Sequence, residues 1–141
     1  MGNNYHADLV NLSQINTNIF KQFNVISIRK RFLGIIKIYK IKIPPNDLHN
    51  VIVSVQANMS KKLNKEWYVS FYNTEQIIVV FRKKIFELST NGITPIYMKK
   101  LDTTNATDKE KWDEMINYAK SLHIPDNQLD FLSPNFRTET Y

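Results

Sequence analysis

The chain has 141 residues, of which 43% are hydrophobic and 23% charged, and its formal net charge is +6 at pH 7. This composition is typical of a globular protein and excludes a disordered or fibrous one. The absence of cysteine excludes disulfide bonds, thiolate metal sites and thiol nucleophiles. No apolar run approaches the roughly 20 residues that a membrane-spanning helix needs.

This length predicts one domain over residues 1–141, with about 1–4 and 134–141 frayed. The start "MGNNYHADLV" lacks the charged and apolar segments of a signal peptide, so we expect a cytoplasmic protein without a membrane partner. Ile, Asn and Lys are abundant, and their codons are rich in A and T. That bias indicates an AT-rich bacterium or one of its mobile elements, and it accounts for some of the Lys content.

The charge is concentrated in the middle of the chain. Residues 29–100 hold 14 Lys or Arg against four acids, whereas residues 101–141 hold four Lys or Arg against eight acids. The middle of the chain is therefore strongly basic and its C-terminal third acidic.

The first half of the chain predicts a helix, a strand and a second helix. A helix is expected over about 5–23, because Leu9, Leu12, Ile15, Ile19 and Phe23 fall on one stripe. A strand is expected over 32–43, with a bulge near Gly34 or burial on both faces. The segment "PPNDLHNVIVSVQANM", residues 44–59, predicts a helix whose first turn tolerates proline.

The second half predicts a meander of strands and a last helix. The segment "KEWYVSFYNTEQIIVVFR", residues 65–82, alternates like a hairpin with a polar turn at 73–75. Short strands are expected over 83–89 and 92–100, either side of the turn signal at 91–92, and Pro95 favours an edge position. After a polar linker over 101–107, Trp112 and Met115 mark the buried stripe of a helix that ends before Pro125.

These elements predict an α+β fold with a mostly antiparallel sheet of four or five strands and helices packed on one face. A ferredoxin-like order of strands and helices is one version of it. The apolar residues after 127 are expected to dock on the core.

The sequence carries no motif for catalysis or for a cofactor. Its three glycines are far apart, which excludes a glycine-rich phosphate loop, and its three histidines lack ligand spacing. No serine lies in a nucleophile-elbow context. We therefore assign no catalytic, cofactor-binding or metal-binding residue and expect no cofactor.

The basic middle offers the candidate contact residues. Sheet-based RNA-binding proteins combine cations that neutralise phosphates with exposed aromatic rings on which bases stack. The candidates for contact with a partner or a nucleic acid are Arg29, Lys30, Arg31, Lys40, Lys42, Tyr68, Tyr72, Arg82, Lys83 and Lys84. Outward Lys on a strand also serves simply to prevent edge-to-edge aggregation, and this interpretation stays open.

Three classes of function follow. The first is a small non-catalytic interaction or accessory module that binds a protein partner or self-associates. The second is nucleic-acid binding through a basic sheet face. The third is an enzyme whose catalytic side chains converge only in the fold. We favour a non-enzyme because no catalytic pattern is visible.

Overall fold

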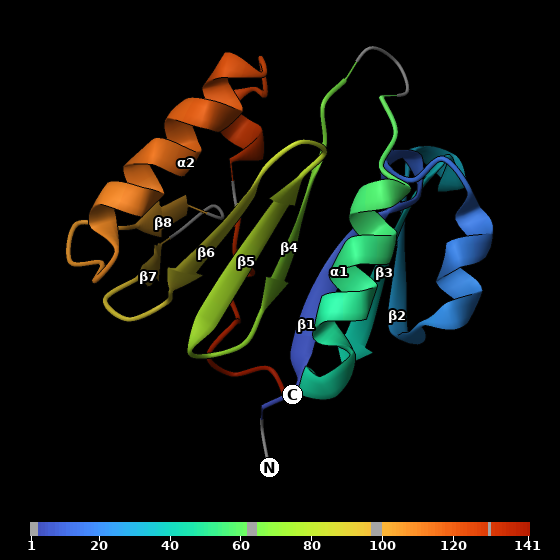
Figure 1. Cartoon of the computed structure of the whole chain (residues 1–141), viewed down its shortest axis with the longest axis horizontal. Helices are drawn as coiled ribbons and strands as arrows, with labels where there is room; N and C mark the ends of the chain where they lie inside the picture. Colours follow the sequence, from blue (N-terminus) through green and yellow to red (C-terminus); the bar gives the residue numbers. More distant parts are fainter. Residues whose placement is uncertain (1–2, 62–64, 97–99, 130) are drawn as a thin grey trace.

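A six-stranded antiparallel sheet forms the centre of the computed structural model, which describes residues 3–61, 65–96, 100–129 and 131–141 (Figure 1). The order of its strands is β2-β3-β1-β4-β5-β6. The strands are β1 (Tyr5–Val10), β2 (Asn24–Arg31), β3 (Ile36–Ile43), β4 (Tyr68–Tyr72), β5 (Gln76–Phe81) and β6 (Ile85–Ser89).

The remaining elements are two helices, a small second sheet and short 3-10 turns. The helices are α1 (Leu48–Ala57) and α2 (Lys109–Ser121), and β7 (Thr94–Ile96) pairs with β8 (Lys100–Asp102). The 3-10 turns are η1 (Asn11–Ser13), η2 (Thr17–Gln22), η3 (Phe32–Gly34), η4 (Pro45–Asp47) and η7 (Asp126–Gln128). Neither described helix is long and apolar enough to cross a membrane.

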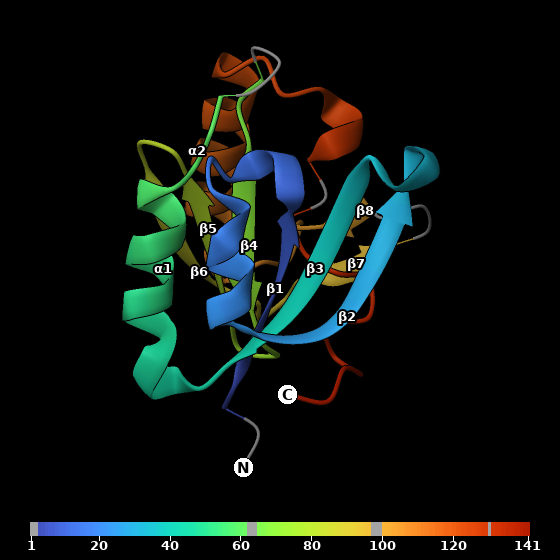
Figure 2. The ribbon, with the colours of Figure 1, turned by 90° about the vertical axis from the view of Figure 1, so that its right-hand side faces the viewer.

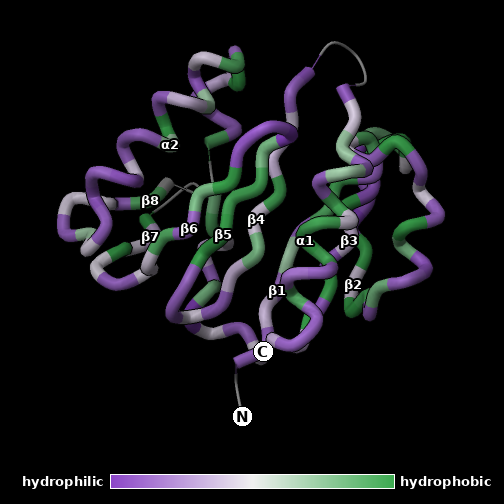
Figure 3. The backbone as a smooth tube through the Cα atoms, viewed as in Figure 1, coloured by the Kyte–Doolittle hydropathy of each residue, from purple (hydrophilic) through white to green (hydrophobic). Residues whose placement is uncertain are grey.

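The sheet buries apolar side chains on both faces. In Figure 3, β5 is hydrophobic along most of its length. Its Ile78 and Val80 join the cluster beneath α1, whereas Ile77 and Val79 join the cluster beneath α2. Because successive side chains of a strand point to opposite faces, α1 and α2 cover opposite faces of the sheet.

The expected α+β class and the antiparallel sheet are therefore confirmed, with two differences in detail. The main sheet has six strands where four or five were expected, and the two helices do not share a face. The physical reason for the second difference is the two-sided apolar character of β5, which needs a cover on each face.

The largest correction concerns residues 5–23, where a helix was expected. Tyr5–Val10 is instead the strand β1, which pairs with β3 and β4 in the interior of the sheet. Ala7 and Leu9 point into the core and alternate with His6 and Asp8 on the other face. The hydrogen-bonding partners on two strands override the helical spacing of the apolar residues.

A second correction concerns the strand expected over 32–43. The strand β3 begins only at Ile36, and β2 precedes it as an additional strand that the sequence pattern did not reveal. The segment between them is the turn η3 of a β2–β3 hairpin, not a bulge. A bulge is present earlier, where the register with β3 shifts between Val25 and Ser27.

The other local predictions are confirmed at the level of elements. They are α1, the β4–β5 hairpin, β6, the turn at 91–92 and α2. The strand expected over 92–100 appears as β7 and the first residue of β8, and 97–99 lie outside the described residues. The linker expected over 101–107 begins with the rest of β8.

The end of the chain packs against the sheet. Phe131 and Leu132 are buried beneath α2, as expected of the docking tail. Phe136, inside the segment expected to fray, is fully buried in the same cluster. This packing brings residues 131–141 over the face of the sheet that carries Asp8 and Lys40.

The structure predicts different costs for truncating two apolar residues that a helix over 5–23 would place on one buried stripe. Leu9 is fully buried, so Leu9→Ala should lower the free energy of unfolding by about 2–5 kcal/mol. Ile15 is 63% exposed, so Ile15→Ala should change it by less than about 0.5 kcal/mol. Urea unfolding followed by tryptophan fluorescence measures both, and equal costs would contradict the strand.

Candidate functional site

The β2–β3 hairpin brings three of the candidate cations to one face of the sheet. The register pairs Ser27 with Lys40 and Arg29 with Ile38, so that Arg29, Arg31 and Lys40 point to the same face. Lys30 pairs with Lys37 and points to the opposite face. The alternation that the sequence suggested for β3 therefore extends across two strands and forms one row of positive charge.

Lys42 continues this row along β3, but it lines a separate cavity of about 370 Å³. That cavity lies between the end of the hairpin and the start of α1, where Phe23 and Val51 supply apolar walls. Lys42 is thus on the predicted face and outside the group formed by Arg29, Arg31 and Lys40.

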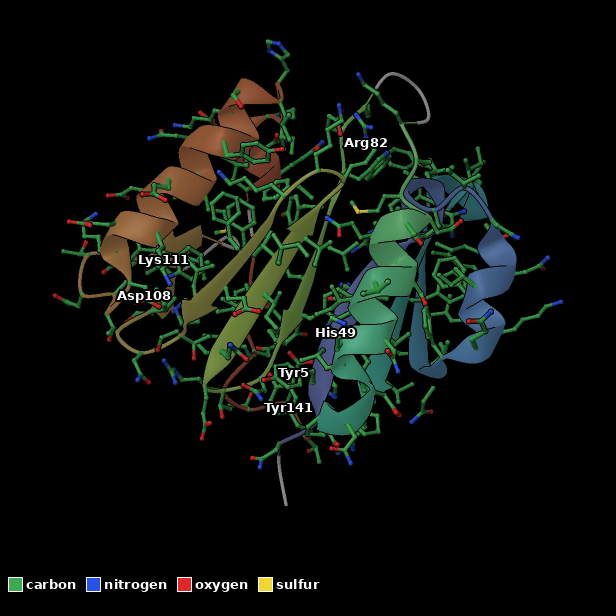
Figure 4. All side chains as sticks on the ribbon, viewed as in Figure 1. Tyr5, His49, Arg82, Asp108, Lys111 and Tyr141 are labelled. Carbon is green, nitrogen blue, oxygen red and sulfur yellow. The ribbon has the colours of Figure 1, made fainter. Side chains whose placement is uncertain are left out.

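The three cations at the β5–β6 turn do not join this row. Arg82 binds Glu66 with 2.9 Å between Nη2 and Oε1, and in Figure 4 it lies at the end of the sheet opposite Tyr5. Hydrogen bonding to Arg82 holds the pKa of the Glu66 carboxyl below its ordinary value. Lys84 lies 5.0 Å from the ring centre of Phe86, and Lys83 is exposed.

Tyr68 and Tyr72 share the face of Arg29 and Lys40 but offer little ring surface to solvent. Tyr72 is 1% exposed, and Tyr68 is half-buried against Phe131 with 4.7 Å between ring centres. The Tyr68 hydroxyl donates to the carbonyl oxygen of Gln128 over 2.6 Å. These two rings build a wall, and a base could not stack on Tyr72 in this arrangement.

Between this wall and the cations lies a cleft of about 540 Å³. Strands β1, β2, β3 and β4 form its floor, and the segment after α2 forms one side. Figure 2 shows this segment beside β1 and β3. The residues that line the cleft are Asp8, Val10, Ser27, Arg29, Arg31, Ile38, Lys40, Glu66, Trp67, Tyr68, Ser70, Tyr72, Ile124, Gln128, Phe131, Leu132, Ser133, Pro134 and Asn135.

One end of the cleft is fixed by a network around Glu139. Its Oε1 accepts from Lys40 Nζ at 2.5 Å and lies 2.8 Å from His6 Nδ1, while Oε2 accepts from the Tyr72 hydroxyl at 2.8 Å. Burial raises the pKa of the Glu139 carboxyl, but the hydrogen bonds from Lys40, His6 and Tyr72 outweigh it, so the pKa is lowered overall. The ring of Tyr141 covers His6, with 4.5 Å between ring centres.

The carboxylate of Asp8, on the floor of the cleft, has fewer and longer polar contacts than that of Glu139. Its Oδ1 is buried without a hydrogen-bond partner among the described residues, and Arg29 and Lys40 approach it only to 3.7 and 3.9 Å. Burial raises the pKa of the Asp8 carboxyl, and these two cations only partly oppose that effect. A buried charge with incomplete pairing lowers the stability of the fold.

Two further polar atoms of the lining residues lack a hydrogen-bond partner within the described part of the chain. They are Ser70 Oγ and Trp67 Nε1. In the antiparallel register between β1 and β4, His6 pairs with Tyr72 and Ala7 pairs with Phe71. Continuing this register by one step places Ser70 opposite Asp8. Buried polar groups usually have partners, so each exception calls for an explanation such as a bound water, an ion or a ligand.

The β2–β3 hairpin tip, defined as residues 32–35, exposes apolar side chains instead of polar ones. Phe32 is 74% exposed, Ile35 68% exposed and Leu33 fully exposed. The φ angles of Phe32 and Leu33 are 52° and 57°, in the left-handed region that bulky residues avoid. On β2 itself, Ile26 and Ile28 are also exposed.

The sequence pattern missed His6, Asp8 and Glu139. The alternation of Tyr5, Ala7 and Leu9 was the one local signal that could have placed His6 and Asp8 on a common face. Within the described ranges, no group of three or more His, Cys, Asp or Glu side chains is arranged to hold a metal ion.

Replacing Glu139 should weaken the anchor of the chain end. Glu139→Gln removes the negative charge facing Lys40 and His6, and it should lower the free energy of unfolding by about 1–3 kcal/mol at neutral pH. Because the folded pKa of Glu139 is lowered, its contribution is complete above the ordinary value of 4.5 and is lost as pH falls below it. The difference between wild type and variant should therefore shrink in acid.

Denaturant titrations at neutral and acidic pH measure this difference. Glu87→Gln is the matched control, because Glu87 is exposed on β6 and its replacement should change stability by less than about 0.5 kcal/mol. A pH-independent effect of Glu139→Gln would contradict the role of its charge.

Replacing Asp8 should raise the free energy of unfolding, whereas replacing Glu139 should lower it. Because the folded pKa of Asp8 is raised, its ionised form disfavours folding once the pH exceeds the ordinary value of 3.8. Asp8→Asn should therefore stabilise the protein by about 0.5–1 kcal/mol at neutral pH. The gain should vanish below pH 3.8, where Asp8 of the wild type is itself protonated. A loss of stability at neutral pH would show that the pairs with Arg29 and Lys40 outweigh the burial.

Comparison of the chain with protein-family models, with curated proteins and with solved structures finds no match. The function is therefore inferred from two surfaces of the molecule. They are the cleft on the sheet and the exposed apolar tip of the β2–β3 hairpin.

Proposed function

We propose that this chain is a small non-catalytic interaction module that binds an acidic protein partner through the β2–β3 hairpin. The observation that carries the proposal is the apolar hairpin tip, where Phe32, Leu33 and Ile35 stand in solvent. Exposed aromatic and aliphatic side chains that gather in one place are typical of protein interfaces.

The backbone of the tip supports the same proposal. Phe32 and Leu33 have positive φ angles although neither is Gly, Asn or Asp. A bulky residue in this conformation costs about 1–2 kcal/mol, and nothing in the described chain packs on Leu33 to offset the cost. Strain and apolar exposure at one turn are both compensated when a partner covers the turn.

The charges of the hairpin favour an acidic partner. Residues 24–37 contain four cations, Arg29, Lys30, Arg31 and Lys37, and no acid. A second copy of the same tip would bring like charges together, whereas an acidic surface would neutralise them. β2 also forms one edge of the sheet, where it pairs only with β3 among the described strands (Figure 2). An extended segment of the partner can add to such an edge.

Nucleic-acid binding is the second possibility, and the row formed by Arg29, Arg31 and Lys40 favours it. The burial of Tyr72 and the half-burial of Tyr68 disfavour it, because bases then lack rings on which to stack. We therefore rank it behind the protein partner.

The cellular setting belongs to the same proposal. The lack of cysteine fits a reducing compartment, and we place the protein in the cytoplasm. The abundance of Ile, Asn and Lys supports an accessory role in an AT-rich bacterium or one of its mobile elements.

The test is selection from a displayed peptide library, followed by binding measurements on the selected peptides. With wild-type protein, the selected peptides should combine Asp or Glu with apolar residues. The variant Phe32→Asn/Leu33→Asn keeps the turn, because Asn tolerates positive φ, and should weaken binding at least about tenfold. Its free energy of unfolding should not fall.

The matched control is Val53→Gln, which removes an exposed apolar side chain from α1 and should leave peptide affinity unchanged. Peptides without acidic residues, or equal affinity of the tip variant, would overturn the proposal. Fluorescence anisotropy with labelled RNA and duplex DNA decides the alternative. The affinity is measured at several salt concentrations. A plot of log affinity against log salt concentration that falls with a slope of about 0.7–0.9 per neutralised phosphate would favour nucleic acid instead.

A further inference from the structure

The cleft on the sheet has features that the hairpin proposal does not use. Its volume of about 540 Å³ lies within the range of about 300–1,000 Å³ that is typical of small-molecule sites. Its floor is a sheet and one of its sides is the packed segment after α2, so its shape depends on ordered elements. These properties are those of a preformed binding site.

One side of the cleft is cationic, and its two arginines are at most weakly paired with acidic side chains of the described residues. Arg31 forms no ion pair with a described residue, and the Nη2 atom of Arg29 approaches Asp8 only to 3.7 Å. Arginine side chains offer paired N–H donors that fit carboxylate and phosphate groups. This side of the cleft is therefore complementary to an anionic group.

The opposite side is apolar. Trp67, Ile124, Phe131 and Leu132 line it, and the first of these is only half-buried. Ile124, Phe131 and Leu132 are already almost fully buried, so a ligand removes mainly Trp67 from water and otherwise contacts a preformed apolar wall. A ligand that fills the cleft therefore needs an apolar or aromatic body next to its charged end.

The floor supplies hydrogen-bonding groups that the fold leaves unused. Ser70 Oγ and Trp67 Nε1 are buried without a hydrogen-bond partner among the described residues, and Asp8 Oδ1 has ion pairs with Arg29 and Lys40 but no hydrogen bond. An unsatisfied buried polar group lowers the stability of the fold, so a ligand that pairs with it supplies the missing hydrogen bond. The indole can only donate and the carboxylate can only accept, whereas the hydroxyl does both.

We propose that this cleft binds a small organic anion with an apolar or aromatic body. The charged group lies at Arg29 and Arg31, and the body lies against Trp67, Phe131 and Leu132. A carboxylate and a phosphate ester share this chemistry. The two proposals share Arg29 and Arg31, but the cleft does not include Phe32 or Leu33, which the peptide test replaces, so the two tests can fail separately.

The experiment uses anilinonaphthalene sulfonate as a fluorescent probe, because it joins an aromatic body to a permanent anion. The wild type should bind it at one saturable site. Arg29→Gln/Arg31→Gln should weaken binding at least about tenfold, because both cations that face the sulfonate are removed. The uncharged anilinonaphthalene should bind wild type and this variant equally. Unsaturable binding, or an unchanged affinity of the variant, would overturn the proposal.

Two control variants separate the site from general effects. Lys21→Gln/Lys83→Gln removes the same net charge from exposed positions and should leave affinity unchanged. Phe32→Asn/Leu33→Asn changes the hairpin tip and should also leave it unchanged, whether or not the tip binds peptides. Near-ultraviolet circular dichroism of each variant shows that the fold is intact, because partly folded proteins also bind this probe.

Displacement of the probe then assigns the anion. Adenosine monophosphate represents phosphate esters, and indole acetate and decanoate represent carboxylates. If only the phosphate ester or only the carboxylates displace the probe, that anionic group is the one that binds the arginine pair. If none of these compounds displaces the probe, the proposal is overturned. Ser70→Ala removes the unpaired hydroxyl without loss of stability, and it should weaken only ligands that carry a hydrogen-bonding group near the floor.

Discussion

The pairing of β1 with both β3 and β4 is the constraint on which the rest of the structure depends. It joins the β2–β3 hairpin to the β4–β6 meander, and with β4 it does so through only two register pairs, His6–Tyr72 and Ala7–Phe71. Ala7 completes the core beneath α1, whereas His6 points to the opposite face. One short strand therefore fixes both the main core and the polar face that carries the cleft.

Much of the fold followed from local patterns, and β1 did not. The β4–β5 hairpin, α1 and α2 each carry their own periodicity and turn signals within one segment, so the sequence predicted them. β1 is defined by partners elsewhere in the chain, since Leu9 pairs with Tyr39 and Ala7 with Phe71. Its apolar residues fit a helical stripe as well as a strand, and only the distant pairing decides between them.

In the candidate site too, the features set by local patterns were predictable and those set by distant contacts were not. Alternation along β3 correctly separated Lys40 from the core residues Tyr39 and Ile41, but the chain end that covers Lys40 and Tyr72 could not be derived from β3 or β4. The packing of this chain end involves Glu139, which contacts His6 across 133 positions of sequence. Contacts at such separations arise from the packing of the whole chain and leave no periodic signal in either segment.

Several features that reduce the stability of the isolated chain lie in one half of the sheet, although Trp112 Nε1 of α2 also lacks a hydrogen-bond partner among the described residues and His123 also has a positive φ angle. The strained tip at Leu33, the incompletely paired Asp8 and the unpaired Ser70 all lie on the β2–β3 hairpin or at the β1–β4 boundary. The half around β5 and β6 instead packs its apolar residues beneath α2, within a continuous buried cluster. Sequences depart from local consistency mainly where binding requires it. Under the two proposals, the half around β5 and β6 acts as a support that allows the other half to keep exposed and unsatisfied groups for the proposed ligands.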